Sequence, residues 1–403
     1  MRIKDIVTFV SKTITPKQGV TYNLYSLPSF DDGKTSERLD GADIQSNKYD
    51  IPSKCILFNK LNVRFRRVWK VDNQDENKIS STEFLPLIVN EEVVDFQYCY
   101  YLLISDSITN YLCGQNTNTS GSHKRIDPNN FLDIEITLPE MSIQKQIGKT
   151  LSALDHKIEI NKQINDNLEA MAKQLYDYWF VQFDFPNKEG KPYKSSGGAM
   201  VWNEKLKREI PQGWHCGTLL DIAEYTNGLA CQKYRPTDEN KLPVIKIKEM
   251  HDGLSVDTEW VKADIPDDVK VFDGDVLFSW SASLEVMLWA YGNGGLNQHI
   301  FKVTSKNGYP RSFYFYQLVH YIGVFKQMAE ARKTTMGHIT QDHLRQSTIV
   351  LPPDVDIANK LEEKLCPIFD AIVKNCQEIM TLTKQRDELL PLLMNGQASV
   401  NSD

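Results

Sequence analysis

The 403-residue sequence has no run of about 18 or more apolar residues, and therefore no segment that could form a membrane-spanning helix. Its first residues, MRIKDIVTFV, lack the charged, apolar and small-residue regions of a signal peptide. The seven cysteines are scattered, with no Cys-x-x-Cys pair, which argues against a disulfide framework and a structural zinc site. We expect a cytoplasmic protein with reduced thiols, no bound metal and no membrane contact.

The sequence also lacks the common catalytic motifs. It contains no Gly-x-Ser-x-Gly elbow, no His-Glu-x-x-His, no phosphate-binding loop ending in Gly-Lys-Ser/Thr, and no Gly-x-Gly-x-x-Gly. His338 and His343 are five residues apart, so one helical face would not carry both as metal ligands. We therefore predict no catalytic residue and no cofactor bound by this chain.

A net excess of positive charge is absent as well. The formal net charge is −7, whereas phosphate binding usually appears as an excess of Lys and Arg. If the protein binds nucleic acid, its cations must be concentrated on the binding surface, because acidic residues outnumber them in the whole chain.

What the sequence does have is a long internal repeat. At an offset of about 214 residues, ITLP at 136–139 aligns with IVLP at 349–352, and the helical segments that follow align as well. The upstream segments match with small gaps: IKDIVTF (3–9) with LLDIAEY (219–225), and CILFNK (55–60) with DVLFSW (275–280). A repeat this long indicates a duplicated unit of globular domain plus helix, with pseudo-twofold symmetry, and is unlike the short periods of solenoids.

Each copy of the repeat ends in a helical segment with a 3.5-residue apolar period, which is typical of a coiled coil. The predicted seam and partner interface comprises Leu151, Leu154, Ile158, Asn161, Leu168 and Leu175 in the first helix and Leu361, Leu365, Ile372, Asn375, Leu382 and Leu389 in the second. The alternative is two amphipathic helices that each pack on their own domain. Asn161 and Asn375 occupy equivalent seam positions, where a polar partner across the interface can fix the register. Pro367 should kink the second helix or delay its first regular turn.

The predicted fold class is α/β (mixed α+β), with two globular domains and two long helices. The predicted boundaries are a first domain at 1–140, a central helix at 141–182, a connector at 183–212, a second domain at 213–353, a distal helix at 354–394 and a tail at 395–403. Pro, Gly and charged residues make the connector typical of a linker.

Candidate binding residues cluster in three places. Residues 59–70 carry five cations and no acidic residue, and as a strand they would place Arg64, Arg66 and Lys70 on one face, beside Lys60. Guanidinium groups on such a face suit phosphate contact, although a solvated basic strand would have the same pattern.

The other two places are repeated loops and a pair of amides. SGSHKRID (120–127) and ARKTTMGHIT (331–340) combine cations, hydroxyls and glycine at equivalent points, and either bind phosphate or start the next element. Asn297 and Gln298 carry amides suited to reading adenine. The candidate residues in these segments are His123, Lys124, Arg125, Arg332, Lys333, Thr335, His338, Asn297 and Gln298.

The central region closely resembles that of type I restriction-modification specificity subunits. The resemblance is carried by LPEMSIQKQIGKTLSALDHKIEINKQINDNLEAMAKQLYDYWFVQFDF followed by GGAMVWNEKLKREIPQGW, and the domain-plus-helix plan extends it over the whole chain. The second helix is a weaker match, with Pro367 where the first copy has Ala153.

The resemblance implies two target recognition domains separated by an antiparallel coiled coil, and no catalytic activity in the chain itself. It implies double-stranded DNA as ligand, with two adenine methyltransferase (modification) subunits and restriction (translocase) subunits as partners. S-adenosylmethionine would belong to the methyltransferase, and ATP and magnesium to the nuclease. The expected target is an asymmetric bipartite sequence. Its two halves should differ, because 59–70 is basic whereas 279–295 is apolar and serine-rich.

Two alternatives remain open at this point. One is a stand-alone endonuclease or methyltransferase with duplicated recognition domains, and the other is a coiled-coil scaffold without a role on DNA.

Overall fold

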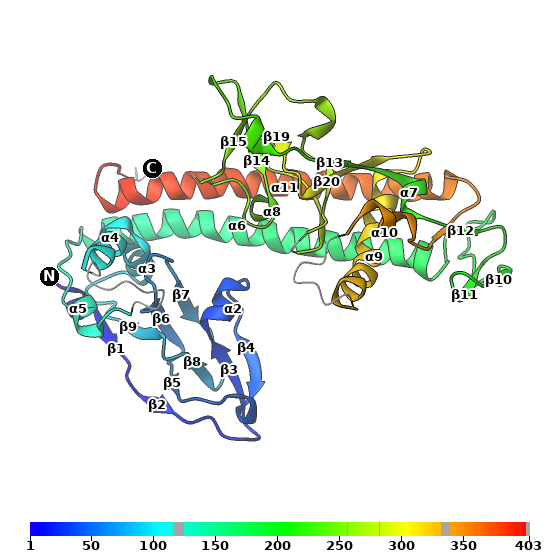
Figure 1. Cartoon of the computed structure of the whole chain (residues 1–403). Coiled ribbons are helices and arrows are strands. Elements are labelled where there is room, and N and C mark those ends of the chain that lie inside the picture. The colour runs from blue at the N-terminus through cyan, green and yellow to red at the C-terminus, as the bar shows by residue number, and fades with distance from the viewer. Residues whose placement is uncertain (116–124, 256, 282, 332–338, 400–403) are drawn as a thin grey trace. The chain divides into compact units, whose positions relative to one another are not determined.

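The computed structural model describes residues 1–115, 125–255, 257–281, 283–331 and 339–399. The chain divides into two compact units. Figure 1 labels their helices and strands. Unit 1 comprises Met1–Lys157 and Leu382–Asp403, and unit 2 comprises Ile158–Thr381. Each unit therefore holds one globular domain together with segments of both long helices.

Unit 1 contains two sheets. The first has the order β1-β9-β6-β7 and is antiparallel throughout, with β1 at Val7–Phe9, β6 at Lys54–Asn59, β7 at Val68–Asp72 and β9 at Phe84–Val89. The second has the order β2-β5-β8-β3-β4, with β2 at Thr13–Ile14, β3 at Thr21–Tyr25, β4 at Glu37–Asp40, β5 at Lys48–Asp50 and β8 at Lys78–Ser80. In β6 the residues Cys55–Asn59 are all buried, as expected for a central strand with an almost continuous apolar sequence.

Helices cover the first sheet of unit 1. They are α1 at Ile3–Ile6, α2 at Leu27–Asp31, α3 at Phe96–Ile104, α4 at Asp106–Gln115 and α5 at Pro128–Leu132. Asp95 caps the start of α3, where its Oδ1 accepts a hydrogen bond from the Tyr98 amide at 3.0 Å.

Unit 2 repeats the two sheets. The first has the order β13-β20-β17-β18, with β13 at Ala223–Asn227, β17 at Val276–Ser279, β18 at Glu285–Leu288 and β20 at Ile300–Ser305. The second has the order β15-β14-β19-β16, with β14 at Lys241–Ile245, β15 at Trp260–Lys262, β16 at Lys270–Val271 and β19 at Gly294–Leu296. The helices are α7 at Leu219–Ile222, α8 at Ile247–Asp252, α9 at Arg311–Ala331 and α10 at Gln341–Arg345, and β12 (His215–Gly217) pairs with β21 (Ile349–Leu351).

The two larger sheets of one unit correspond to those of the other in their strand pairings. The order of the first sheet is the same in both, since β1, β9, β6 and β7 take the places of β13, β20, β17 and β18. In the second sheet, the parallel pair β3–β8 corresponds to the parallel pair β14–β19, and an antiparallel strand flanks each pair on both sides. Within these two sheets of the described residues, only β2 has no counterpart, and the strand pairs β10–β11 and β12–β21 occur in unit 2 alone. The predicted internal repeat and mixed fold class are confirmed.

The two long helices are α6 at Met141–Tyr176, continued by a π-helical turn at Asp177–Val181, and α11 at Asp356–Met394. They are antiparallel in both units. In unit 1, Ile147 and Leu151 near the start of α6 share a core with Leu390 and Leu393 near the end of α11. In unit 2, Ala172 and Tyr176 near the end of α6 share a core with residues near the start of α11, such as Leu361 and Phe369.

The predicted seam residues are buried or partly buried at every position. Two of the polar positions have partners across the pair. Asn375 donates to Asn165 Oδ1 at 3.0 Å, and Asn161 donates to Glu378 Oε2 at 3.1 Å. Of the two effects predicted for Pro367, a delayed first turn is wrong, because α11 begins at Asp356 and continues through Pro367, which is exposed. The kink stays a prediction.

The segment expected as a connector, 183–212, is folded. β10 (Met200–Asn203) and β11 (Arg208–Pro211) form a hairpin, and Phe183, Phe185 and Ile210 are buried in the main core of unit 2. At the other end of the chain, the Gln397 amide donates to the Leu392 carbonyl at 2.8 Å, so the start of the predicted tail turns back on α11. None of the described helices is both long and apolar enough to span a membrane.

Candidate nucleic-acid interface

The basic segment 59–70 is not one strand, which corrects the sequence-based prediction. β6 ends at Asn59 and β7 begins at Val68, so residues 60–67 form a loop between two neighbouring strands. Asn62 has a φ of 56°, a left-handed conformation that Asn tolerates better than most residues, and it turns the chain. We call residues 60–67 the unit 1 loop.

A buried side chain holds the start of the unit 1 loop. Asn59 is 2% exposed, and its Nδ2 donates to the Leu61 carbonyl at 2.6 Å while its Oδ1 accepts from the Leu61 amide at 2.8 Å. The Lys60 amide donates to the Glu83 carbonyl at 2.9 Å, and the Lys60 carbonyl accepts from the Ile126 amide at 2.9 Å. The loop therefore leaves the sheet at a fixed point.

Cations surround one exposed aromatic ring on this loop. Phe65 is 47% exposed, and the guanidinium carbons of Arg64 and Arg67 lie 4.7 and 5.1 Å from its ring centroid. Arg67 forms two hydrogen bonds of 2.7 Å with Asp31, and Arg66 forms an ion pair with Asp106. Among the described residues, Arg64 has no ion pair, so its exposed guanidinium is available for a phosphate or a base edge.

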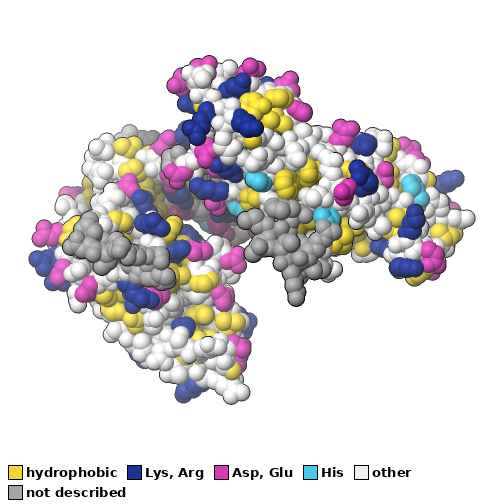
Figure 2. Space-filling view, in the orientation of Figure 1, with side chains coloured by type: hydrophobic (Ala, Val, Ile, Leu, Met, Phe, Trp, Pro, Cys, Tyr) yellow, Lys and Arg dark blue, Asp and Glu magenta, His cyan; other side chains and the backbone are white. Residues whose placement is uncertain are grey.

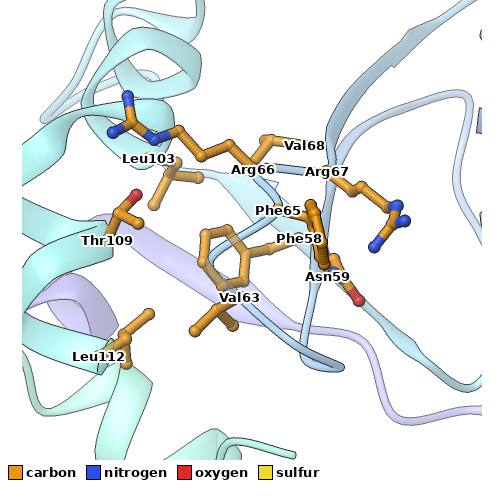
Figure 3. A pocket seen from close by; sticks show the side chains of 10 residues that line it. All are labelled: Phe58, Asn59, Val63, Phe65, Arg66, Arg67, Val68, Leu103, Thr109 and Leu112. Atoms are coloured by element: carbon orange, nitrogen blue, oxygen red, sulfur yellow. The ribbon is translucent and has the colours of Figure 1, made fainter. Parts of the chain in front are cut away.

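Arg66 and Arg67 extend to opposite sides of the loop, with Phe58 and Phe65 between them (Figure 3). The cavity under the loop, lined by Phe58, Val63, Thr109 and Leu112 among others, has a volume of about 10 Å³. That is about the space of one water molecule. The loop is thus a packed platform that presents side chains outward, and not the rim of a small-molecule pocket.

Arg125 adds a further cation beside the loop. Its backbone forms a β-bridge with Leu61, and its guanidinium binds both carboxylate oxygens of Glu83, with Nη2–Oε1 at 2.7 Å and Nε–Oε2 at 2.9 Å. The hydrogen bond from Arg125 holds the pKa of the Glu83 carboxyl below its ordinary value, against an opposing effect of burial. Because Arg125 remains more than half exposed, it can still contact an anion.

Unit 2 has a loop at the equivalent place between β17 and β18, and we call its described residues 280, 281, 283 and 284 the unit 2 loop. Ser279 takes the place of Asn59: it is fully buried, and its hydroxyl donates to the carbonyls of Ser281 and Ser283. The Trp280 carbonyl accepts from the Ile339 amide at 3.0 Å, as the Lys60 carbonyl accepts from Ile126. Both units therefore hold the loop and the returning chain by the same backbone hydrogen bond.

The side chains on the two loops differ. Where unit 1 carries arginines and Phe65, unit 2 carries Trp280, whose Nε1 donates to Asn227 at 3.0 Å and whose ring lies 5.7 Å from that of His299. His299 is exposed, and its Nε2 lies 3.4 Å from the Gln298 amide nitrogen. Gln298 and His299 lie between β19 and β20, so imidazole and amide groups stand beside the unit 2 loop, where unit 1 has guanidinium groups.

Two predicted DNA-contacting residues lie inside the fold. The Lys70 ammonium donates to Gln97 at 2.9 Å and lies 4.5 Å from the ring centroid of Tyr100, and burial lowers the pKa of Lys70. Asn297 is 5% exposed, its Oδ1 accepts from the His299 amide, and its backbone pairs with Leu229. Both side chains are committed to internal contacts, so we do not retain them at the interface.

The remaining predicted residues are placed as follows. Lys60 is partly buried, Arg64 and Arg66 are exposed on the unit 1 loop, Arg125 lies beside that loop, and Gln298 is partly exposed in unit 2. His123, Lys124, Arg332, Lys333, Thr335 and His338 lie outside the described residues. On the face shown in Figure 2, Lys and Arg side chains are interspersed with Asp and Glu side chains.

The profile of a protein family described as "Type I restriction modification DNA specificity domain" matches residues 1–170 and 211–388. The two matches cover most of the chain and correspond to its two repeats. The chain belongs to this family. Its function is DNA sequence specificity in a type I restriction-modification system, and its role there is non-catalytic.

Known members of the specificity family are similar over most of this chain. The MjaIX specificity subunit of Methanocaldococcus jannaschii is 25% identical over 81% of this chain and 74% of its own length. The HindI specificity subunit of Haemophilus influenzae is 24% identical over 87% of this chain and 90% of its own length. The fold agrees with the crystal structure of a type I S subunit from M. genitalium, which covers 100% of this chain and 96% of its own with a TM-score of 0.59 at 13% identity.

Sequence reasoning missed several residues of this specificity subunit. Phe65, Arg67, Trp280 and His299 were not among the predicted binding residues. Asn62 was the available signal for the turn in unit 1, because Asn favours left-handed backbone conformations. For Trp280, the repeat alignment of CILFNK with DVLFSW already placed it opposite Lys60.

Proposed function

We propose that this specificity subunit recognises an asymmetric bipartite sequence in double-stranded DNA, with one half-site read by each unit. The observation that carries the proposal is the pair of equivalent loops, which have the same backbone anchoring and different exposed side chains. Arginines around an aromatic ring suit guanine edges and phosphates, whereas an imidazole beside an amide suits other donor and acceptor patterns. Two units that present different chemistry favour two different half-sites.

The proposed partners are two adenine methyltransferase subunits and, for restriction, translocase subunits. An exposed apolar stripe on α6 supports a docking surface for such a partner: Ile160, Ile164 and Met171 are 40, 41 and 50% exposed. Beside this stripe, Met171, Leu175, Tyr178 and two glutamines line an open groove of about 370 Å³. Large apolar side chains gathered on one helix face are a feature of protein interaction sites.

The cofactors of the proposed complex would belong to those partners. S-adenosylmethionine is the methyl donor of an adenine methyltransferase, and ATP with magnesium serves a translocating nuclease. This chain would contribute only the choice of DNA sequence.

Mapping of N6-methyladenine tests the proposal. The chain is expressed with its methyltransferase partner in a host that lacks this methylation, and modified sites are sequenced genome-wide. We expect two different half-sites separated by a nonspecific spacer of constant length. An inverted palindrome would contradict the assignment of one distinct half-site to each unit.

The alternative, a stand-alone endonuclease or methyltransferase, predicts a different result from the purified chain. Incubated alone with DNA, magnesium and S-adenosylmethionine, a stand-alone enzyme would cleave or methylate the DNA. We expect neither reaction until the methyltransferase partner is added. A scaffold without a role on DNA would give no protection of DNA even with that partner present.

A further inference from the structure

Because the two halves of the chain are similar, α6 and α11 could each pair with the same helix of a second copy of the chain. Counting the 214-residue offset along the helices, Asp155 of α6 is equivalent to Phe369 of α11, and Ala172 of α6 is equivalent to Arg386 of α11. In the domains, Tyr101 of α3 and Tyr316 of α9 occupy corresponding positions, five residues after the start of each helix.

In unit 1 these positions form a polar cluster. The Tyr101 hydroxyl donates to Asp155 Oδ2 at 2.5 Å, and Arg386 Nη1 lies 3.0 Å from Asp155 Oδ1. The side chains of Asp155 and Arg386 are only 27 and 26% exposed. The ion pair therefore joins α6 to α11 in a largely dehydrated position.

In unit 2 the corresponding positions are apolar. Phe369 is 1% exposed, Ala172 is fully buried, and both belong to the same core. The ring centroids of Tyr316 and Phe369 lie 5.9 Å apart. A tyrosine from the domain thus contacts the helix pair at the same place in both units, but it meets an ion pair in one and a phenylalanine in the other.

This difference penalises pairing between like helices. If α6 of one copy packed against α6 of a second copy in the same antiparallel register, Asp155 would face Ala172. If α11 packed against α11, Arg386 would face Phe369. Asp155 would lose its cation, and Arg386 would keep only Asp387, its neighbour on the same helix, while the side chains of Asp155 and Arg386 stay mostly buried. Removal of one partner from such a pair is strongly unfavourable.

The asparagines of the seam do not make this distinction. Asn375 of α11 is equivalent to Asn161 of α6, so a pair of α6 helices would place Asn165 opposite Asn161 and could restore an amide hydrogen bond. The asparagines can fix the register of a helix pair, but they do not distinguish pairing of α6 with α11 from pairing of two like helices. Among the described seam contacts, Asp155–Arg386 is the ion pair that joins α6 to α11.

We propose that the Asp155–Arg386 ion pair selects the association of α6 with α11 and disfavours dimers in which the like helices of two copies pair. The inference goes beyond DNA recognition, because it concerns how a chain made of two similar halves avoids combining with a second copy. Two copies can also exchange helices while still pairing α6 with α11, and such a dimer keeps the ion pair. The amount of dimer that wild type forms measures this background.

The test uses full-length chains with two different affinity tags, unfolded together, refolded at high concentration and analysed for mixed-tag dimers. The main variant, Asp155→Phe with Arg386→Ala, places in unit 1 the residues that already occupy these positions in unit 2. We expect it to form mixed-tag dimers about tenfold or more above wild type, because the penalty on like pairing is removed. The matched control reverses an exposed pair on the same helix, Lys384→Glu with Glu388→Lys, and should behave as wild type.

A second set of variants keeps the test decisive if the main variant does not refold. Arg386→Asp places like charges across α6 and α11 and should raise the mixed-tag fraction. The reversed variant combines Asp155→Arg with Arg386→Asp, which restores an opposite pair, and adds Tyr101→Phe, which removes the hydroxyl that binds Asp155. Its mixed-tag fraction should return to the wild-type level. Equal mixed-tag fractions in wild type and the main variant, or in the like-charge and reversed variants, would overturn the proposal.

Discussion

At the scale of single residues, the unit 1 loop shows what sequence can and cannot predict. The position of the cations at 60–67 was predictable from their clustering, but their geometry was not, because a strand and a turn with Asn62 differ only in local backbone conformation. Asn297 shows the opposite failure. Its side chain carries an amide suited to adenine, but the residue is 5% exposed and its Oδ1 accepts a hydrogen bond from the His299 amide.

Substitution of Asn59 by alanine should loosen the unit 1 loop. It removes both hydrogen bonds to Leu61 in a buried place, which should lower the free energy of unfolding by about 1–3 kcal/mol. Denaturant unfolding measures this change. Asn47→Ala, at an exposed asparagine of the same unit, should lower it by much less, and equal losses in the two variants would contradict the anchoring role.

Arg64→Ala should weaken DNA binding by the complex. If Arg64 contacts one phosphate, the slope of log affinity against log salt concentration should fall in magnitude by about 0.9. Titration of the specific DNA at several salt concentrations gives this slope. Lys12→Ala, at an exposed lysine of the same unit, is the control, and an unchanged slope and affinity in Arg64→Ala would remove this residue from the interface.

The Glu83–Arg125 contact makes a pH-dependent contribution. The folded pKa of Glu83 is lowered, so its stabilising effect is present above the ordinary carboxyl pKa and is lost as the pH falls through the folded value. Glu83→Gln cannot lose a charge, so the stability advantage of wild type over this variant should shrink on acidification. Thermal unfolding from neutral to acidic pH would show it; a constant difference would contradict the linkage.

At the scale of secondary structure, the helices were the most predictable elements, because a 3.5-residue apolar period repeated over several turns leaves little choice of burial. The partners of the polar seam residues were not predictable. Asn161 and Asn375 are equivalent in sequence, yet one binds Glu378 and the other Asn165, since the two antiparallel helices place different residues opposite them. The delayed first turn expected from Pro367 was wrong, because the helix is already regular from Asp356 onward.

Asn165→Leu should destabilise the helix pair. It leaves the Asn375 amide without its acceptor, a loss of about 1–3 kcal/mol in the free energy of unfolding. Adding Asn375→Leu should recover most of this loss, since two apolar side chains can then pack together. A double-mutant cycle by denaturant unfolding gives the coupling, and additive losses would show that the two amides act independently.

At the scale of the whole molecule, the duplication could be detected in the sequence. Both copies keep the apolar periodicity of the helix, and ITLP in the first copy aligns with IVLP in the second. The folded segment at 183–212 could not be predicted as such, because its glycines, prolines and charges are typical of linkers. Its hairpin and core contacts make it part of unit 2.

Under the proposed function, helix length should set the DNA spacer. Four residues inserted after Asn161, compensated in α11, add roughly 6 Å of helix, or about two base pairs of DNA. Methylation mapping in such a strain should show a longer spacer between unchanged half-sites. An unchanged spacer would reject this relation.

The hydrogen bonds from Ile126 to Lys60 and from Ile339 to Trp280 have a consequence for how new specificities arise. Each fixes the base of a loop through backbone atoms alone, so the side chains beyond it can be exchanged while strand register and core stay intact. Evolution can therefore vary what the protein reads at little cost to folding, and it can do so in one half without disturbing the other.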